Sequence, residues 1–163
     1  MTTNIGDPYL KLRASPPTPE DEICRCKLGA PVKLVSTLSN NPVQCLMCRG
    51  EVPPERIGFG ADLGEAISVW RHTHDALYRL WLGSGEYETW AAEKLGDPNG
   101  EVNVEGLKIA VRLNEFVSAY FYWFAADEDK SLRHCPVCRG ELGDSQDAGL
   151  RVCAACKILV AGR

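Results

Sequence analysis

The chain has 163 residues, a formal net charge of −4 at pH 7 and a mean hydropathy of −0.18. This length suits one domain, or two small ones in close association, with a modest core. The net negative charge argues against a strongly basic nucleic-acid-binding protein, in which neutralisation of phosphates supplies most of the affinity. Residues 1–8 lack the basic start and apolar stretch of a secretory signal, so we expect a cytoplasmic protein.

Residues 1–22 are rich in proline and charge and are predicted to form a flexible lead-in. The next segment, 23–60, contains the first four cysteines. Within it, residues 31–36 alternate apolar and polar side chains, which predicts a strand, and Ser39–Pro42 is a predicted turn. We expect this segment to bind one metal ion through Cys24, Cys26, Cys45 and Cys48.

The central segment, 61–129, is predicted to be mainly helical. Apolar residues recur at three- and four-residue steps over 62–82, a second and shorter helix is expected from Ser84 to Gly96, and Asn103 is a candidate N-cap for a third. The aromatic run 117–124 fits either a strand or an extension of the third helix, and its aromatic content favours the strand.

The last segment, 130–163, has the spacing of a zinc ribbon, with two C-x2-C pairs as candidate ligands: Cys135, Cys138, Cys153 and Cys156. Together the segments predict an α+β fold. In this fold two four-cysteine zinc elements flank a central helical segment, and the strands are short and antiparallel.

Thiolates in close pairs can converge on one tetrahedral ion, and four cysteines close its coordination sphere, as in a structural site. We therefore expect two zinc ions per chain. Three alternatives remain open at this level: a disulfide framework, which the missing secretory signal disfavours; iron, which also takes four-thiolate sites; and ligand sets that mix the two halves of the chain.

The histidines give little support to an enzyme. His72 and His74 lie about 200° apart around a helix, so they cannot hold one ion together. We expect His74 to be a hydrogen-bonded, partly buried residue, and His134 to hydrogen-bond a metal-bound thiolate of the neighbouring site. No nucleophile–base pair or phosphate-binding glycine loop is recognisable, so a non-catalytic protein is expected.

The order of these features resembles the bacterial zinc-ribbon proteins of unknown function for which nucleic-acid binding has been suggested. The resemblance covers residues 43–160, and it rests on the Cys45–Pro54 turn, the Ile67–Trp70 and Leu80–Gly85 segments, the Gly106-Leu107 helix, the aromatic run and the two C-terminal C-x2-C pairs. It implies a C-terminal ribbon and metal ligation by Cys45 and Cys48. Cys24 and Cys26 are assigned from spacing alone.

Charge along the chain leaves two kinds of partner open. Residues 24–60 carry five basic and two acidic side chains, residues 130–163 carry six and three, and residues 61–129 carry five and thirteen. Each occupied four-cysteine site would add about −2, because four thiolates outweigh one Zn²⁺. The candidate nucleic-acid contacts are Lys130, Arg133, Arg139 and Arg151.

The alternative is an adaptor or inhibitor that docks a basic protein through acidic residues of the helical segment. These are Glu86, Glu88, Glu93, Asp97, Glu101 and Glu105. No membrane association is expected, and the sequence leaves the oligomeric state open.

Overall fold

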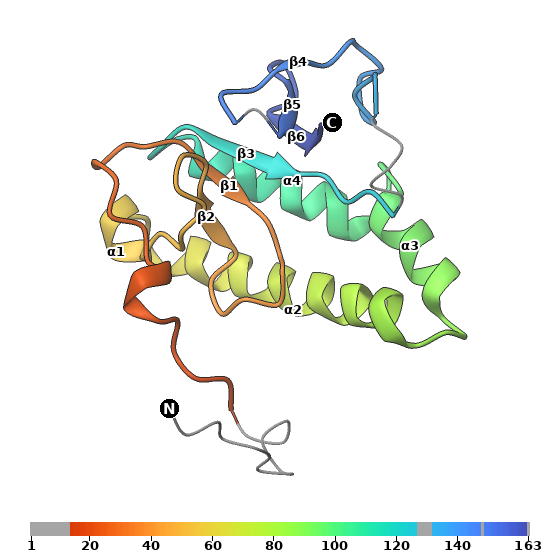
Figure 1. Cartoon of the computed structure of the whole chain (residues 1–163), viewed down its shortest axis with the longest axis horizontal. Coiled ribbons are helices and arrows are strands. Elements are labelled where there is room, and N and C mark those ends of the chain that lie inside the picture. The colour runs from red at the N-terminus through yellow and green to blue at the C-terminus, as the bar shows by residue number, and fades with distance from the viewer. Residues whose placement is uncertain (1–13, 127–131, 148, 163) are drawn as a thin grey trace, which may run out of the picture.

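The computed structural model describes residues 14–126, 132–147 and 149–162 (Figure 1). Its helices are α1 (Pro54–Ile57), α2 (Ala61–Gly83), α3 (Glu88–Gly96) and α4 (Glu101–Leu113), preceded by a 3₁₀ turn, η2 (Glu20–Glu22). Its strands are β1 (Val32–Leu34), β2 (Val43–Cys45), β3 (Ala119–Tyr122), β4 (Gly143–Asp144), β5 (Leu150–Cys153) and β6 (Ile158–Ala161). The predicted α+β class, with four-cysteine groups on both sides of a helical segment, is confirmed.

All six strands form one mixed sheet with the order β2-β1-β3-β6-β5-β4. The pairs β1–β2, β5–β6 and β4–β5 are antiparallel, as expected from the sequence. The central strand β3 pairs in parallel with both β1 and β6, so the prediction of antiparallel strands is wrong for these two pairs. An alternating pattern of apolar and polar residues predicts which side chains share a face of the sheet, but it does not identify the neighbouring strand. Through β3, the N-terminal and C-terminal cysteine segments become parts of one sheet.

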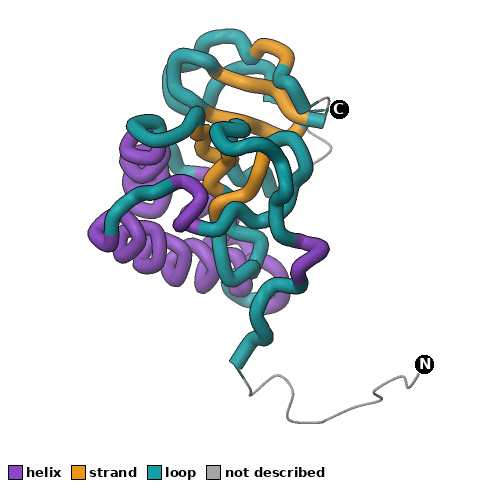
Figure 2. The backbone as a smooth tube through the Cα atoms, turned by 90° about the vertical axis from the view of Figure 1, so that its left-hand side faces the viewer, coloured by secondary structure: helices purple, strands orange, loops and turns teal. Residues whose placement is uncertain are grey.

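The long helices pack on one side of the strands (Figure 2). The indole Nε1 of Trp70 in α2 donates to the carbonyl of Val102 in α4 at 2.8 Å, which ties the two helices together. Phe121 of β3 meets Trp70 edge-on at 5.9 Å between ring centroids. Gly106 lies at this contact, because a Cβ there would fall 2.8 Å from Cζ of Phe121. Helix α4 therefore approaches the sheet more closely than a side chain would permit.

The predicted helices and the aromatic strand agree with the structure to within a few residues at their ends. The predicted N-cap is wrong, because α4 begins at Glu101 and Gly100 occupies its cap position. Asn103 is instead buried inside α4, where its Nδ2 donates to the carbonyls of Leu95 at 2.9 Å and Asp97 at 2.8 Å. Its side chain thus closes the end of α3, a role that depends on how α3 and α4 pack.

Most of the predicted lead-in, residues 1–13, lies outside the described residues. The described part contacts the N-terminal cysteine segment, since Thr18 donates to the carboxylate of Glu51 at 2.5 Å and Asn40 donates to the carbonyl of Pro16 at 2.8 Å. Among the helices of the described ranges, none combines the length and the apolar character needed to cross a membrane.

Candidate metal centres

The N-terminal cysteines converge in space. The Sγ atoms of Cys24, Cys26, Cys45 and Cys48 all lie within 4.8 Å of one another. Cys45 is the last residue of β2, and the Cys24 amide donates to the carbonyl of Glu51 at 2.7 Å, so main-chain pairing brings the C-x-C loop beside the C-x2-C turn. The C-x-C pair and the first C-x2-C pair thus form one potential ligand set.

The C-terminal cysteines form a second group of the same kind, with Sγ atoms again within 4.8 Å of one another: Cys135, Cys138, Cys153 and Cys156. The Cys138 and Cys153 sulfurs are 3.6 Å apart. Four sulfurs at about 2.3 Å from a tetrahedral zinc ion lie roughly 3.8 Å from one another, so this spacing fits such a site. All eight cysteines are free thiols, and each group combines residues from one half of the chain.

The two C-x2-C-R-G turns have the same backbone geometry. The amide of Cys45 donates to the carbonyl of Gly50, and the amide of Cys135 to that of Gly140, both at 2.8 Å. Arg49 and Arg139 each donate from their amide to the carbonyl of the first cysteine of their own turn. Their φ angles are 64° and 63°, in the left-handed region. One short sequence therefore produces the same metal-binding turn in both halves.

The backbone of these turns also adjusts the acidity of the thiols. A hydrogen bond from the Gly140 backbone, helped by the neighbouring thiols, lowers the pKa of Cys138 to about 7. Burial would raise the pKa of Cys48, but the Gly50 backbone and the other thiols outweigh it and lower the pKa to about 7. Hydrogen bonding to Cys48 and Cys45, with burial, raises the pKa of Cys26 to about 12. Cys48 and Cys138 are thus ready to ionise near neutral pH, whereas ionisation of Cys26 depends on the charge of a bound cation.

Arg56 supports the N-terminal group and was missed in the sequence analysis. From α1 its guanidinium donates to the carbonyls of Cys24 and Cys26, and so it holds both ends of the C-x-C loop. The two parts are far apart in the chain, and the sequence contains no local signal for this contact. One planar guanidinium group thus donates to two carbonyls that would otherwise need other donors.

The candidate nucleic-acid contacts that the structure describes differ in their exposure to solvent. Arg133 and Arg139 are exposed on the C-terminal segment. Arg151 is partly buried, and its Nη2 donates to the carbonyl of Leu142 at 2.5 Å, so it braces the ribbon. Lys130 lies outside the described residues.

The structure differs from both predictions about histidines. His74 is only 5% exposed, and within the described part of the chain its Nδ1 has no hydrogen-bond partner. The prediction of a hydrogen-bonded, partly buried His74 is therefore wrong at Nδ1. His74 lies on the apolar stripe of α2, and its ring is buried in the interior for that reason. His134 is exposed, and among the described residues no hydrogen bond joins its ring to a cysteine.

Comparison of the sequence with models of protein families, with curated proteins and with solved structures found no match.

Proposed function

We propose that this protein is a non-catalytic zinc protein whose two four-cysteine sites are structural, and that it recognises a basic partner protein. Two closed four-sulfur groups support zinc as a structural ion, since catalytic zinc keeps a position open. Metal analysis should find two zinc ions per chain. A red, iron-containing preparation from cells supplied with both metals would contradict the assignment of zinc.

The observation that supports a protein partner best is an exposed aromatic and acidic surface at the α2–α3 junction, between Leu82 and Glu93. We call it the junction surface. Tyr87 is 51% exposed and Trp90 is 47% exposed, and both are side chains that dominate the energy of protein interfaces. Around them lie three exposed carboxylates, which favour a basic partner by charge complementarity: Glu86, Glu88 and Glu93. The junction is at the end of the molecule opposite α1 (Figure 1).

Three of the five basic residues of the N-terminal segment are either buried or held by contacts within the protein. Arg56 holds the C-x-C loop, and Arg49 forms an ion pair with Asp147 at 3.1 Å. Lys33 is 8% exposed. Arg25 and Lys27 remain exposed, so the positive charge available near the first metal site is confined to two side chains, which favours the protein partner over nucleic acid.

A second candidate function is nucleic-acid binding by the C-terminal ribbon. The exposed Arg133 and Arg139 favour it, and so does the resemblance in feature order to bacterial zinc-ribbon proteins for which nucleic-acid binding has been suggested. The two candidates use opposite charges on different surfaces, so one set of variants separates them.

Fluorescence anisotropy with the zinc-loaded protein tests both. The probes are a labelled basic amphipathic peptide and labelled single- and double-stranded oligonucleotides, each titrated at low salt and again as salt is raised. We expect saturable binding of the peptide that is weakened in Trp90→Ala and in Glu93→Lys. Arg139→Glu, on the other surface, is the control and should leave peptide binding unchanged.

The outcomes are distinct. If the affinity for the peptide is unchanged in Trp90→Ala, the attraction arises from net charge alone, and the junction surface is not the docking site. Salt-sensitive binding of oligonucleotides that disappears in Arg133→Glu and Arg139→Glu would establish the second candidate instead. Failure to bind either probe with both metal ions in place would contradict both.

A further inference from the structure

A cavity of about 340 Å³ lies where three parallel strands end. Residues that follow β1 (Val35, Ser36) and β3 (Phe124, Ala125) line it, together with the last residue of β6, Ala161. The carboxyl ends of parallel strands meet at one edge of a sheet, and that edge is a recurrent position for ligand sites. The volume falls within the range of small-molecule sites. No cysteine of the metal centres and no residue of the junction surface lines this cavity.

Aromatic rings form one wall of the cavity. Trp81 of α2 meets Phe124 edge-on with ring centroids 4.9 Å apart, and Tyr78 lies 5.3 Å from Trp81 and 6.3 Å from Phe124. All three rings line the cavity, as does Tyr122 of β3. Offset and edge-on contacts with such rings favour a flat aromatic guest.

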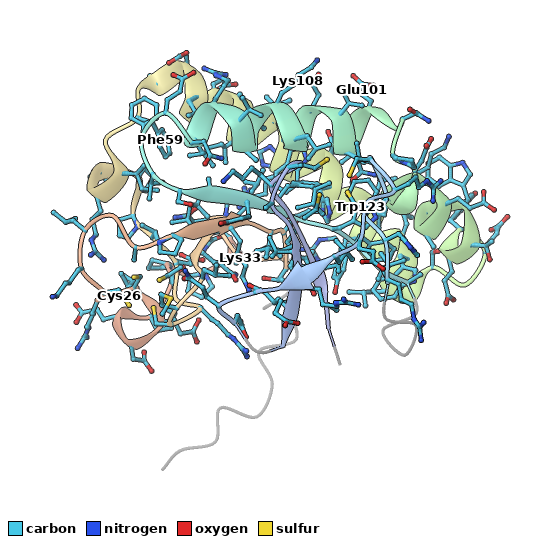
Figure 3. The ribbon with its side chains drawn as sticks, turned by 90° about the horizontal axis from the view of Figure 1, so that it is seen from above. Cys26, Lys33, Phe59, Glu101, Lys108 and Trp123 are labelled. Atoms are coloured by element: carbon cyan, nitrogen blue, oxygen red, sulfur yellow. The ribbon has the colours of Figure 1, made fainter. Side chains whose placement is uncertain are left out.

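Lys33 supplies a buried positive charge at the same cavity. It is 8% exposed, and its Nζ lies 5.5 Å from the centre of the Tyr122 ring. Within the described ranges no carboxylate lies at ion-pair distance from this ammonium group. Burial lowers its pKa, an effect that Asp147 and Cys45 oppose and Arg49 reinforces. Figure 3 shows Lys33 in the middle of the molecule, well away from Cys26 at one side. A buried ammonium group without a counterion is unfavourable, and an anion in the cavity would relieve it.

The remaining polar groups leave a net positive charge. Arg49 and Asp147 also line the cavity, and they neutralise each other through contacts of 3.1 and 3.3 Å. His74 lines it too, and its buried Nδ1 lacks a hydrogen-bond partner among the described residues. Among the residues that line the cavity, one cation therefore remains without an opposite charge.

We propose that this cavity binds a small aromatic monoanion, an aromatic carboxylate, with its ring against Trp81 and Phe124 and its carboxylate on Lys33. An aliphatic acid would lose the contacts with the rings, and a neutral aromatic molecule would leave Lys33 without a counterion. Both features of the ligand are thus required.

Calorimetry with the zinc-loaded full chain tests each feature separately. The probes are 2-naphthoate, the uncharged 2-naphthamide and the aliphatic cyclohexanecarboxylate. We expect saturable binding of 2-naphthoate, with the other two weaker by about tenfold or more, as the loss of a charge-assisted contact or of stacking implies. Equal affinity for naphthoate and naphthamide, or no saturable binding of naphthoate, would overturn the proposal.

Two variants assign the binding to Lys33. In Lys33→Met, the affinity for naphthoate should fall to that for naphthamide. Lys157→Met is a matched control, because Lys157 lies over the Tyr120 ring at 5.3 Å in the same manner but does not line the cavity. An equal loss in both variants would contradict a specific site.

A measurement on the wild-type chain covers the case in which Lys33→Met does not fold. With ¹⁵N-labelled histidine, naphthoate should shift the ring nitrogens of His74 and leave those of exposed His72 unmoved. The His74→Asn variant assigns the signal. Saturable binding without any shift at His74 would place the ligand elsewhere and overturn the proposal.

Discussion

At the scale of single residues, the burial of His74 has a thermodynamic cost. His74 is buried among aromatic rings, with ring centroids 5.1 Å from Trp70 and 6.2 Å from Tyr78. Burial lowers the pKa of His74 to about 4, whereas in the unfolded chain a histidine titrates near 6.5. Protonation therefore favours the unfolded state.

This difference predicts a pH dependence of the free energy of unfolding. The contribution of His74 is complete well above pH 6.5 and decreases as pH falls through 6.5 towards 4, because only the unfolded chain gains a proton in that window. Between pH 7.5 and pH 6 the loss should be roughly 0.8 kcal/mol. Denaturant unfolding of His74→Phe at both pH values should lack this loss, whereas His72→Phe, at an exposed position of the same helix, should retain it. Identical pH profiles for wild type and His74→Phe would refute the assignment.

Arg139 and Arg49 occupy left-handed positions that favour glycine. Arg139→Gly is expected to stabilise the zinc-loaded protein by roughly 0.5–1 kcal/mol, while Arg139→Ala should give no such gain. Arg49→Gly should gain less, because it also removes the largely exposed ion pair with Asp147, which contributes about 0–1 kcal/mol. Thermal and denaturant unfolding compare the three variants. A destabilised Arg139→Gly would show that its guanidinium has a structural partner.

At the scale of elements, the contact of α4 with β3 depends on one missing side chain. A Cβ on Gly106 would clash with Phe121 and lie 2.9 Å from Nε1 of Trp70. Gly106→Ala should therefore destabilise the fold by about 1–3 kcal/mol, even though alanine is the better helix former.

Gly64 is the matched control for this substitution. It lies within α2, and the nearest atom to a Cβ there is Cε2 of Phe59 at 3.9 Å, an ordinary contact. Gly64→Ala should stabilise by up to about 1 kcal/mol, from helix propensity alone. Opposite signs of the two changes in free energy of unfolding support the close helix–sheet contact, and a gain in both variants would contradict it.

The helices also show which structural features a sequence pattern can predict. The apolar steps along α2 predicted its ends to within a residue, because the helical period is a local property. Asn103 was misassigned, because its residue type suits a cap but its carbonyl partners belong to α3 and the turn that follows it. Arg56 was missed for the same reason, since its partners are main-chain groups of a distant loop.

At the scale of the whole molecule, β3 joins the two cysteine segments. Its Phe121 amide and the Trp123 amide just beyond it donate to the carbonyls of Lys157 and Leu159, both at 2.8 Å, while on the other side the Val32 amide donates to the carbonyl of Ser118, also at 2.8 Å. Disruption of one metal site should therefore weaken the sheet beyond its own half.

Cys156→Ser tests this coupling. We expect loss of one of two zinc ions and faster hydrogen exchange at the Phe121 and Trp123 amides, because β6 loses its anchoring turn. Cys24→Ser should likewise release one ion, with the faster exchange at Val32. If Cys156→Ser increased exchange only beyond residue 132, the two halves would be energetically independent.

The sequence by itself determined the eight thiols, their four close pairs and the main helices, and it favoured a strand for the aromatic run. Each of these follows from spacing over a few residues, where backbone hydrogen bonds and the helical period operate. Only the tertiary structure decided that the cysteines gather as two groups, one from each half, and that β3 runs parallel to β1 and β6. It also decided that Lys33 and His74 line one cavity. Such contacts join segments far apart in the chain, and they depend on the packing of the whole core, which no local pattern encodes.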